Sequence, residues 1–209
     1  MSENYISTIA KDRIYPIIRC QDAQETKQIA EALISGGIKV LEINVETPEI
    51  YDVIQDISRL ATVSAGGIIT STQADIAFKH GAKVFASPIF QMSLVKISKN
   101  LRIPFIAGTT TANEAYEAWK ARIPLIKIFP ADAMGGCQYI KNILRQMPFL
   151  NLMPTGDIKL SEVVSYLNSG AIAVGVGRDF YQGFTPNEIT KRTKEILTEV
   201  RDFTTWNKK

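Results

Sequence analysis

The sequence has few of the residues that commonly bind metals or form disulfide bridges. It contains two cysteines, Cys20 and Cys137, and a single histidine, His80, in 209 residues. The cysteines lie far apart and form no CxxC pair, which argues against structural zinc and against a disulfide framework. We therefore expect a protein of the reducing cytoplasm.

Strong charge and long apolar runs are also missing. The formal net charge is +3 and the basic residues are scattered, so the chain lacks the electrostatic footprint of a nucleic-acid-binding protein. The N-terminal segment has no apolar signal core, and no apolar run approaches the roughly 20 residues that span a membrane. With 45% hydrophobic residues, residues 1–209 are expected to form one domain.

Short apolar segments alternate with amphipathic ones along the chain. The apolar segments are nearly continuous, as strands buried on both faces are, and the amphipathic segments keep apolar residues on one helical face. This alternation predicts an all-parallel α/β fold. The expected strands are Ile14–Ile18, Ile38–Ile43, Ala61–Ala65, Lys83–Ala86, Ile103–Ile106, Leu125–Phe129, Leu150–Met153 and Ala171–Val174.

The expected helix starts carry capping signals. Three places have capping-box spacing, and two have a threonine followed by a proline at the first helical position. The former are Asp22 with Glu25, Thr70 with Gln73 and Thr111 with Glu114, and the latter are Thr47-Pro48 and Thr185-Pro186.

Two topologies fit this pattern: a closed barrel and an open, doubly wound sheet. The open sheet would normally carry a GxGxxG turn after the first strand, whereas Arg19-Cys20-Gln21-Asp22 stands there. We therefore expect a single-domain (β/α)8 TIM barrel. Its active site should lie at the C-terminal ends of the strands.

Lys127 and Glu42 are the most informative residues at those strand ends. Each lies within an apolar strand and should face the barrel interior. Burial removes hydration from Lys127 and favours the neutral amine, which can attack a carbonyl carbon. Glu42 would then handle protons. A structural ion pair, or a lysine that extends its amine to the surface, is the alternative.

Glycines follow the last two expected strands. In barrels the loops at these positions often bind phosphate through backbone N–H groups. Gly156, Gly175 and Gly177 suit this role because glycine allows close approach of the backbone. The same glycines would also suit ordinary tight turns.

Several segments together resemble the 2-keto-3-deoxy-6-phosphogluconate/4-hydroxy-2-oxoglutarate aldolases, also called the KDPG/KHG aldolases. The resemblance extends over nearly the whole chain, and its most specific segment is Lys127-Ile128-Phe129-Pro130-Ala131-Asp132 followed by Gly135-Gly136. The others are IYPIIR, ALISGGIKVLEI, KVFASP, PFIAGTTTANEA, LMPTGD and AVGVG.

The resemblance implies a class I aldolase, a carbon–carbon lyase without a metal or organic cofactor. Lys127 would form a Schiff base with a 2-keto acid, and Glu42 would move protons through a water. Pyruvate would be released together with glyceraldehyde 3-phosphate or glyoxylate. The resemblance also implies a homotrimer in carbohydrate metabolism. The substrate-binding residues would be Arg19, Thr155, Gly66, Gly67, Pro88 and Phe129.

The chain departs from the family pattern around the expected substrate. Glu46 replaces an arginine that aids carboxylate binding, and Gly67 replaces a threonine. Ile89 stands where the family has glycine after Ser-Pro. Asp157 replaces a glycine near the expected phosphate, which it should repel, and Arg178 stands in place of a serine and could attract that phosphate.

Two other functions fit the same residues. The Schiff base could decarboxylate a 3-carboxy-2-keto acid such as oxaloacetate, because the iminium is the electron sink in both reactions. Alternatively, the barrel could bind an anionic metabolite without catalysis, with Lys127 paired only electrostatically to Glu42. The second alternative predicts ligand-induced stabilisation without a covalent adduct.

Overall fold

The computed structural model describes residues 5–206, and side chains as far as residue 201. Its eight strands form one parallel sheet in the order β7-β6-β5-β4-β3-β2-β1-β8. A backbone hydrogen bond of 2.9 Å from Ile172 N–H to Leu152 O connects the two edges. The strands are β1 (Ile14–Ile18), β2 (Val40–Asn44), β3 (Thr62–Gly66), β4 (Val84–Ser87), β5 (Phe105–Thr109), β6 (Leu125–Ile128), β7 (Leu152–Pro154) and β8 (Val174–Val176).

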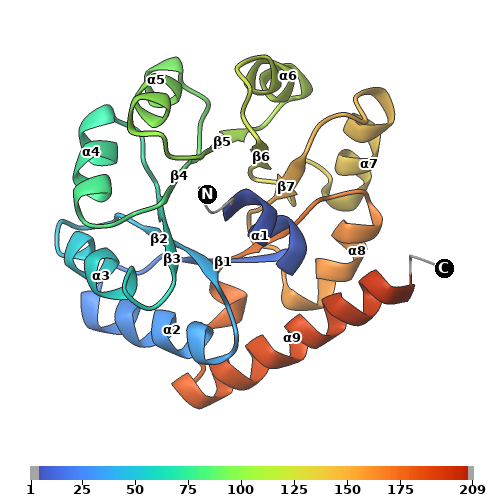
Figure 1. The fold of residues 1–209 in the computed structure, drawn as a ribbon. Helices are drawn as coiled ribbons and strands as arrows, with labels where there is room; N and C mark the ends of the chain where they lie inside the picture. Colours follow the sequence, from blue (N-terminus) through green and yellow to red (C-terminus); the bar gives the residue numbers. More distant parts are fainter. Residues whose placement is uncertain (1–4, 207–209) are drawn as a thin grey trace.

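Helices surround this sheet and confirm the predicted barrel (Figure 1). The N-terminal helix α1 lies across one end of the barrel, and the others form the outer ring. The helices are α1 (Tyr5–Asp12), α2 (Ala23–Ser35), α3 (Ile50–Ile57), α4 (Ser71–Lys79), α5 (Met92–Leu101), α6 (Ala112–Lys120), α7 (Gly136–Gln146), α8 (Val163–Asn168) and α9 (Pro186–Trp206), with short 3-10 turns η1 (Leu160–Glu162) and η2 (Arg178–Phe180).

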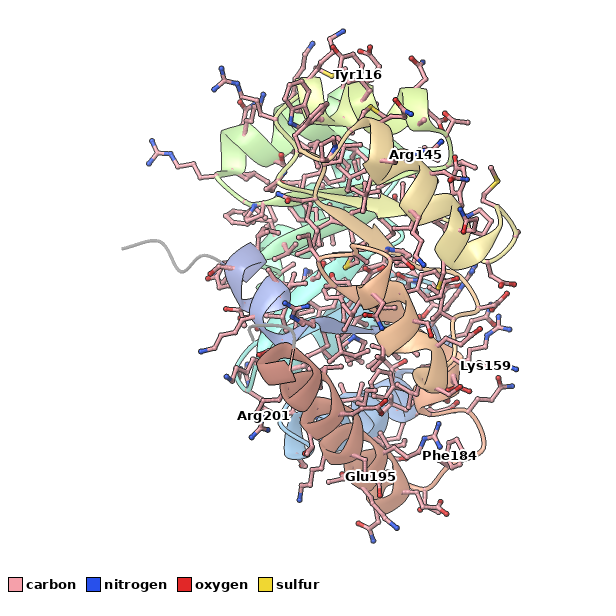
Figure 2. All side chains as sticks on the ribbon, turned by 90° about the vertical axis from the view of Figure 1, so that its right-hand side faces the viewer. Tyr116, Arg145, Lys159, Phe184, Glu195 and Arg201 are labelled. Atoms are coloured by element: carbon pink, nitrogen blue, oxygen red, sulfur yellow. The ribbon has the colours of Figure 1, made fainter. Side chains whose placement is uncertain are left out.

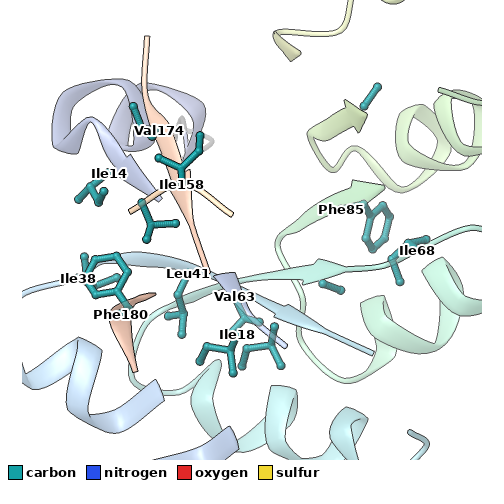
Figure 3. Packing of buried hydrophobic residues seen from close by; sticks show 14 of the residues in the cluster. Ile14, Ile18, Ile38, Leu41, Val63, Ile68, Phe85, Ile158, Val174 and Phe180 are labelled. Carbon is teal, nitrogen blue, oxygen red and sulfur yellow. The ribbon is translucent and has the colours of Figure 1, made fainter. Parts of the chain in front are cut away.

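Two hydrophobic cores stabilise the barrel. The larger lies between the sheet and the ring of helices, and Figure 3 shows part of it, including Ile14, Ile18 and Leu41. The smaller fills the barrel interior, where Ile9 of α1 meets Tyr15 and other inward-facing strand residues. Because side chains alternate along a strand, neighbouring residues of β1 belong to different cores.

The predicted strands all overlap the observed ones, but the boundaries shift by up to three residues. The last expected strand began at Ala171, whereas β8 begins at Val174. The ends of the expected domain, residues 1–4 and 207–209, lie outside the described part of the chain. No helix within residues 5–206 is long and apolar enough to cross a membrane.

The capping predictions have mixed outcomes. Complete capping boxes open α4 and α6, and α9 begins at Pro186 as expected. Asp22 caps α2 through Glu25 N–H, but the Glu25 side chain accepts instead from Cys20 Sγ. The Thr47-Pro48 start is wrong. Ile50 N–H and Tyr51 N–H bond to residues three earlier, which makes a turn, and α3 begins at Ile50.

Candidate active site

A cavity of about 810 Å³ opens at the C-terminal ends of the strands. Residues from the ends of β1, β2, β6 and β8, and from the loops that follow the strands, line it. In Figure 2 its rim residues Lys159 and Phe184 lie on the side of the molecule opposite α1. The cavity therefore occupies the end of the barrel at which the sequence placed the active site.

Lys127 and Glu42 meet at the base of this cavity. Lys127 Nζ lies 2.9 Å from Glu42 Oε1 and 2.8 Å from Oε2. Their strands, β6 and β2, are four positions apart in the eight-stranded order, so the two side chains reach toward each other across the interior. Lys127 is 5% exposed and Glu42 is 2% exposed. Within the described part of the chain, the hydrogen bonds of this buried amine to side chains both go to one carboxylate.

Gly66 provides space for this pair. It ends β3 beside Asn44 of β2, and a Cβ atom added to it would lie 2.5 Å from Glu42 Oε1 and 2.0 Å from Asn44 Oδ1. Gly66 does not line the cavity but backs Glu42, whereas Gly67, Pro88, Phe129 and Thr155 do line it. Steric room at Gly66 therefore fixes where the carboxylate can sit.

An ion pair occupies the rim near the end of β1. Arg19 Nε donates to Glu46 Oε1 at 3.0 Å, and the Arg19 side chain is 57% exposed. Tyr181 holds the backbone here, since its hydroxyl oxygen accepts from Arg19 N–H at 3.0 Å. Burial raises the pKa of Tyr181. Glu46, which replaces an arginine of the family pattern, is thus a partner of Arg19. The ion pair holds the Arg19 guanidinium over the cavity mouth.

The loops after β7 and β8 form the opposite side of the mouth. Gly156, Asp157, Gly175, Gly177 and Arg178 all line the cavity there, with Asp157 and Arg178 exposed.

Two charged residues that the sequence analysis had not singled out accompany these loops: Lys159 and Asp179. Asp179 accepts from Leu160 N–H at 2.8 Å and lies 3.5 Å from Arg192 Nη2, so its charge is partly compensated. Lys159 adds a second exposed cation to this side of the mouth.

The structure brings the expected site residues together and adds others. Asn44, Lys159, Tyr181, Gln182 and Phe184 also line the cavity. Asn44 follows Glu42 by two residues on a strand, so alternation would have placed it on the same face. The other four lie in loops or short turns, where the sequence carries no periodic signal.

The described residues provide no set of side chains that could bind a metal ion. Among the described residues, no group of three or more His, Cys, Asp and Glu side chains could hold a metal ion. His80 lies at the end of α4, where its Nδ1 atom is 2.8 Å from Ile76 O. This is the helix-capping role that its position before Gly81 indicates.

Comparisons with known proteins agree with this geometry. The family model "KDPG and KHG aldolase" matches residues 6–193. A 2-dehydro-3-deoxy-phosphogluconate aldolase of Haemophilus influenzae is 26% identical over 208 residues, which cover 96% of this chain and 98% of that protein.

Two solved structures are similar over most of their length. The 2-keto-3-deoxy-6-phosphogluconate aldolase of Zymomonas mobilis with 3-phosphoglycerate has a TM-score of 0.83 at 26% identity, covering 92% of this chain and 94% of that one. The KDPG aldolase of Legionella pneumophila with pyruvate captured as a covalent carbinolamine intermediate has a TM-score of 0.82 at 26% identity, covering 91% and 96%.

The barrel, the buried lysine–glutamate pair and the aldolase relatives together place the protein among the carbon–carbon lyases. The chain belongs to the KDPG and KHG aldolase family.

Proposed function

We propose that the protein cleaves a 2-keto-3-deoxy sugar acid, or 4-hydroxy-2-oxoglutarate, to pyruvate and an aldehyde through a Schiff base on Lys127. The observation that carries this proposal is the buried contact between Lys127 and Glu42 at the base of the cavity. A neutral amine attacks carbonyl carbon, and an adjacent carboxylate can take the proton that an ammonium must first lose. No organic cofactor takes part in this scheme.

The reaction begins with attack of Lys127 Nζ on C2 of the keto acid. Glu42 moves protons while the carbinolamine loses water, which leaves an iminium. The C3–C4 electron pair then moves toward the iminium nitrogen, the C4 hydroxyl loses its proton and the aldehyde departs. The enamine that remains is protonated at C3, and water releases pyruvate and the free amine.

The substrate carboxylate and the reacting carbons would lie between Arg19 and the buried pair. A guanidinium matches a carboxylate through paired N–H groups. Glu46 already binds Arg19 Nε, so Arg19 would offer its remaining N–H groups from a fixed orientation. Thr155, Gly67, Pro88 and Phe129 would line the pyruvate moiety.

We expect Arg178 to bind a phosphate at the far end of the substrate, beside the backbone of Gly156, Gly175 and Gly177. Arg178→Ala should raise KM for a phosphorylated substrate by about tenfold or more, the effect of losing a charge-assisted hydrogen bond. It should leave KM for 4-hydroxy-2-oxoglutarate nearly unchanged. Asp157→Asn should act in the opposite direction, since it removes a like charge. Steady-state kinetics on both substrates measures this, and equal KM changes for both would exclude the phosphate role.

Borohydride trapping with pyruvate tests the central proposal. Reduction should fix pyruvate covalently to Lys127, which peptide mass spectrometry identifies, and Lys127→Met should give no adduct. Lys79→Met is the matched control, because it removes a lysine that pairs with the Asp75 carboxylate on α4, outside the cavity lining, and retains Lys127. If the folded protein gives no adduct at saturating pyruvate but is stabilised by it, the barrel is a binding protein. Carbon dioxide release from oxaloacetate without aldol cleavage would instead identify a decarboxylase.

We further propose that residues 1–209 form one domain that assembles as a homotrimer in the cytoplasm. Support comes from the family resemblance and from the scarcity of cysteine. Light scattering during gel filtration should give about three times the chain mass of 23.2 kDa.

A further inference from the structure

Three buried polar atoms near Glu42 make no hydrogen bond of good geometry within the described residues. They are Tyr15 Oη, Ser64 Oγ and Asn44 Oδ1. Tyr15 and Ser64 are 0% exposed. A buried hydroxyl without a partner costs stability, so a cluster of such groups in one place calls for a physical reason.

The strand register places two of these hydroxyls around the carboxylate. Ser64 is paired with Glu42 across β2 and β3, and Ile17 of β1 is paired with Glu42 on the other side. Tyr15 lies two residues before Ile17 and therefore also faces inward. It belongs to the layer of interior side chains that is next to Glu42 on the side away from the cavity mouth. Glu42 is thus flanked by a hydroxyl-bearing residue from each neighbouring strand.

Tyr15 remains a hydrogen-bond donor throughout the working pH range. Burial, followed by the negative charge of Glu42, raises the pKa of Tyr15 well above its ordinary value. The phenol also lies close enough to Ser64 and Glu42 for weak hydrogen-bonding interactions, of which the one with Ser64 lowers this pKa and the one with Glu42 raises it. The phenol is therefore protonated and adjacent to a carboxylate. A phenylalanine would fill the same apolar layer without leaving a polar atom unpaired.

The chemistry of Lys127 gives a reason for keeping these buried hydroxyls beside Glu42. In the resting state its amine contacts both oxygens of Glu42. In the iminium the nitrogen is joined to C2 by a double bond, and only one N–H remains on it. At least one oxygen of Glu42 then loses its donor at the step in which the carboxylate must act on the substrate.

We propose that Tyr15 and Ser64 are positioning residues whose hydroxyls bind Glu42 once Lys127 has become an iminium. This inference rests on the proposed function of Lys127 and Glu42. The hydroxyls hold one carboxylate oxygen in place and leave the other to exchange protons with C3.

Deuterium exchange into the methyl group of pyruvate isolates this step. Exchange in D2O, followed by NMR, requires the iminium and then removal of a C3 proton, and it needs no aldehyde. Groups facing Glu42 are Tyr15, Ser64, Asn44 and Lys127, and the charged groups nearer the mouth are Arg19, Glu46, Asp157, Lys159, Arg178 and Asp179. The test variants below change only Tyr15 and Ser64, and the control changes Tyr166, which belongs to neither set.

Tyr15→Phe and Ser64→Ala should each move the acid limb of the exchange profile to higher pD by about one unit, because the ionised carboxylate loses a donor. The double variant should show a larger shift than either one. Borohydride trapping at saturating pyruvate should still label Lys127 fully in each case, which locates the effect after Schiff-base formation. Tyr166→Phe is the matched control, since Tyr166 is also buried but lies outside the cavity lining.

The outcomes separate this inference from the function on which it rests. Normal trapping with an unshifted exchange profile in Tyr15→Phe and Ser64→Ala would overturn the positioning role alone. Absence of an adduct in the unmodified protein would overturn both. If Tyr15→Phe does not fold, Ser64→Ala decides, because it removes one small hydroxyl group.

Discussion

Replacing Lys127 with methionine is expected to abolish aldol cleavage and to lower the free energy of unfolding by about 3–5 kcal/mol, the usual cost of removing one member of a buried ion pair. Methionine has a similar length and suits the apolar strand. Glu42, which is 2% exposed, would remain in the interior without its cationic partner. Chemical denaturation and a coupled assay for pyruvate measure the two effects separately.

A double variant separates catalysis from stability. Lys127→Met combined with Glu42→Met removes both charges and should recover most of the lost stability, since apolar replacements of buried ion pairs are often neutral or stabilising. Its activity should remain absent. Recovery of stability without activity would indicate that the pair is kept for its chemistry. A double variant as unstable as the single one would contradict this, and activity in Lys127→Met would contradict the Schiff-base assignment.

The barrel and its two central residues could be predicted because both follow from alternation along strands. Apolar runs fixed the strands, and a lysine or glutamate inside such a run must face a site where its charge is compensated. Parallel strands in a barrel bring their C-terminal ends to one mouth. Lys127 and Glu42, 85 residues apart in the sequence, could therefore be placed at the same mouth, whereas their direct contact required the structure.

Other parts of the site depend on contacts that the sequence does not encode locally. Arg19 and Glu46 lie in two different loops, so the sequence shows that Glu46 replaces a carboxylate-binding arginine of the family but not that it pairs with Arg19. Tyr15 lies within the expected apolar strand Ile14–Ile18. Alternation along that strand gives its inward direction, but the position of its hydroxyl beside Glu42 required the register of three strands.

Gly66 illustrates how a residue without a side chain controls the site. Its conversion to alanine should reduce turnover by about 10²- to 10⁴-fold, the range associated with loss of a positioned acid–base group. The added Cβ would lie 2.5 Å from Glu42 Oε1 and 2.0 Å from Asn44 Oδ1, closer than real contacts allow. The carboxylate must therefore move away from its present contact with Lys127.

Gly36→Ala provides a control with matched steric overlap. Its added Cβ would lie 2.4 Å from Thr193 Cβ, at the contact of α2 with α9 and away from the cavity. Both variants should be destabilised, because both force a packed neighbour to move. Only Gly66→Ala should lose turnover when rates are compared per folded molecule. Equal specific activity in the two variants would mean that Glu42 tolerates displacement, and that its placement is set by Lys127 rather than by the space at Gly66.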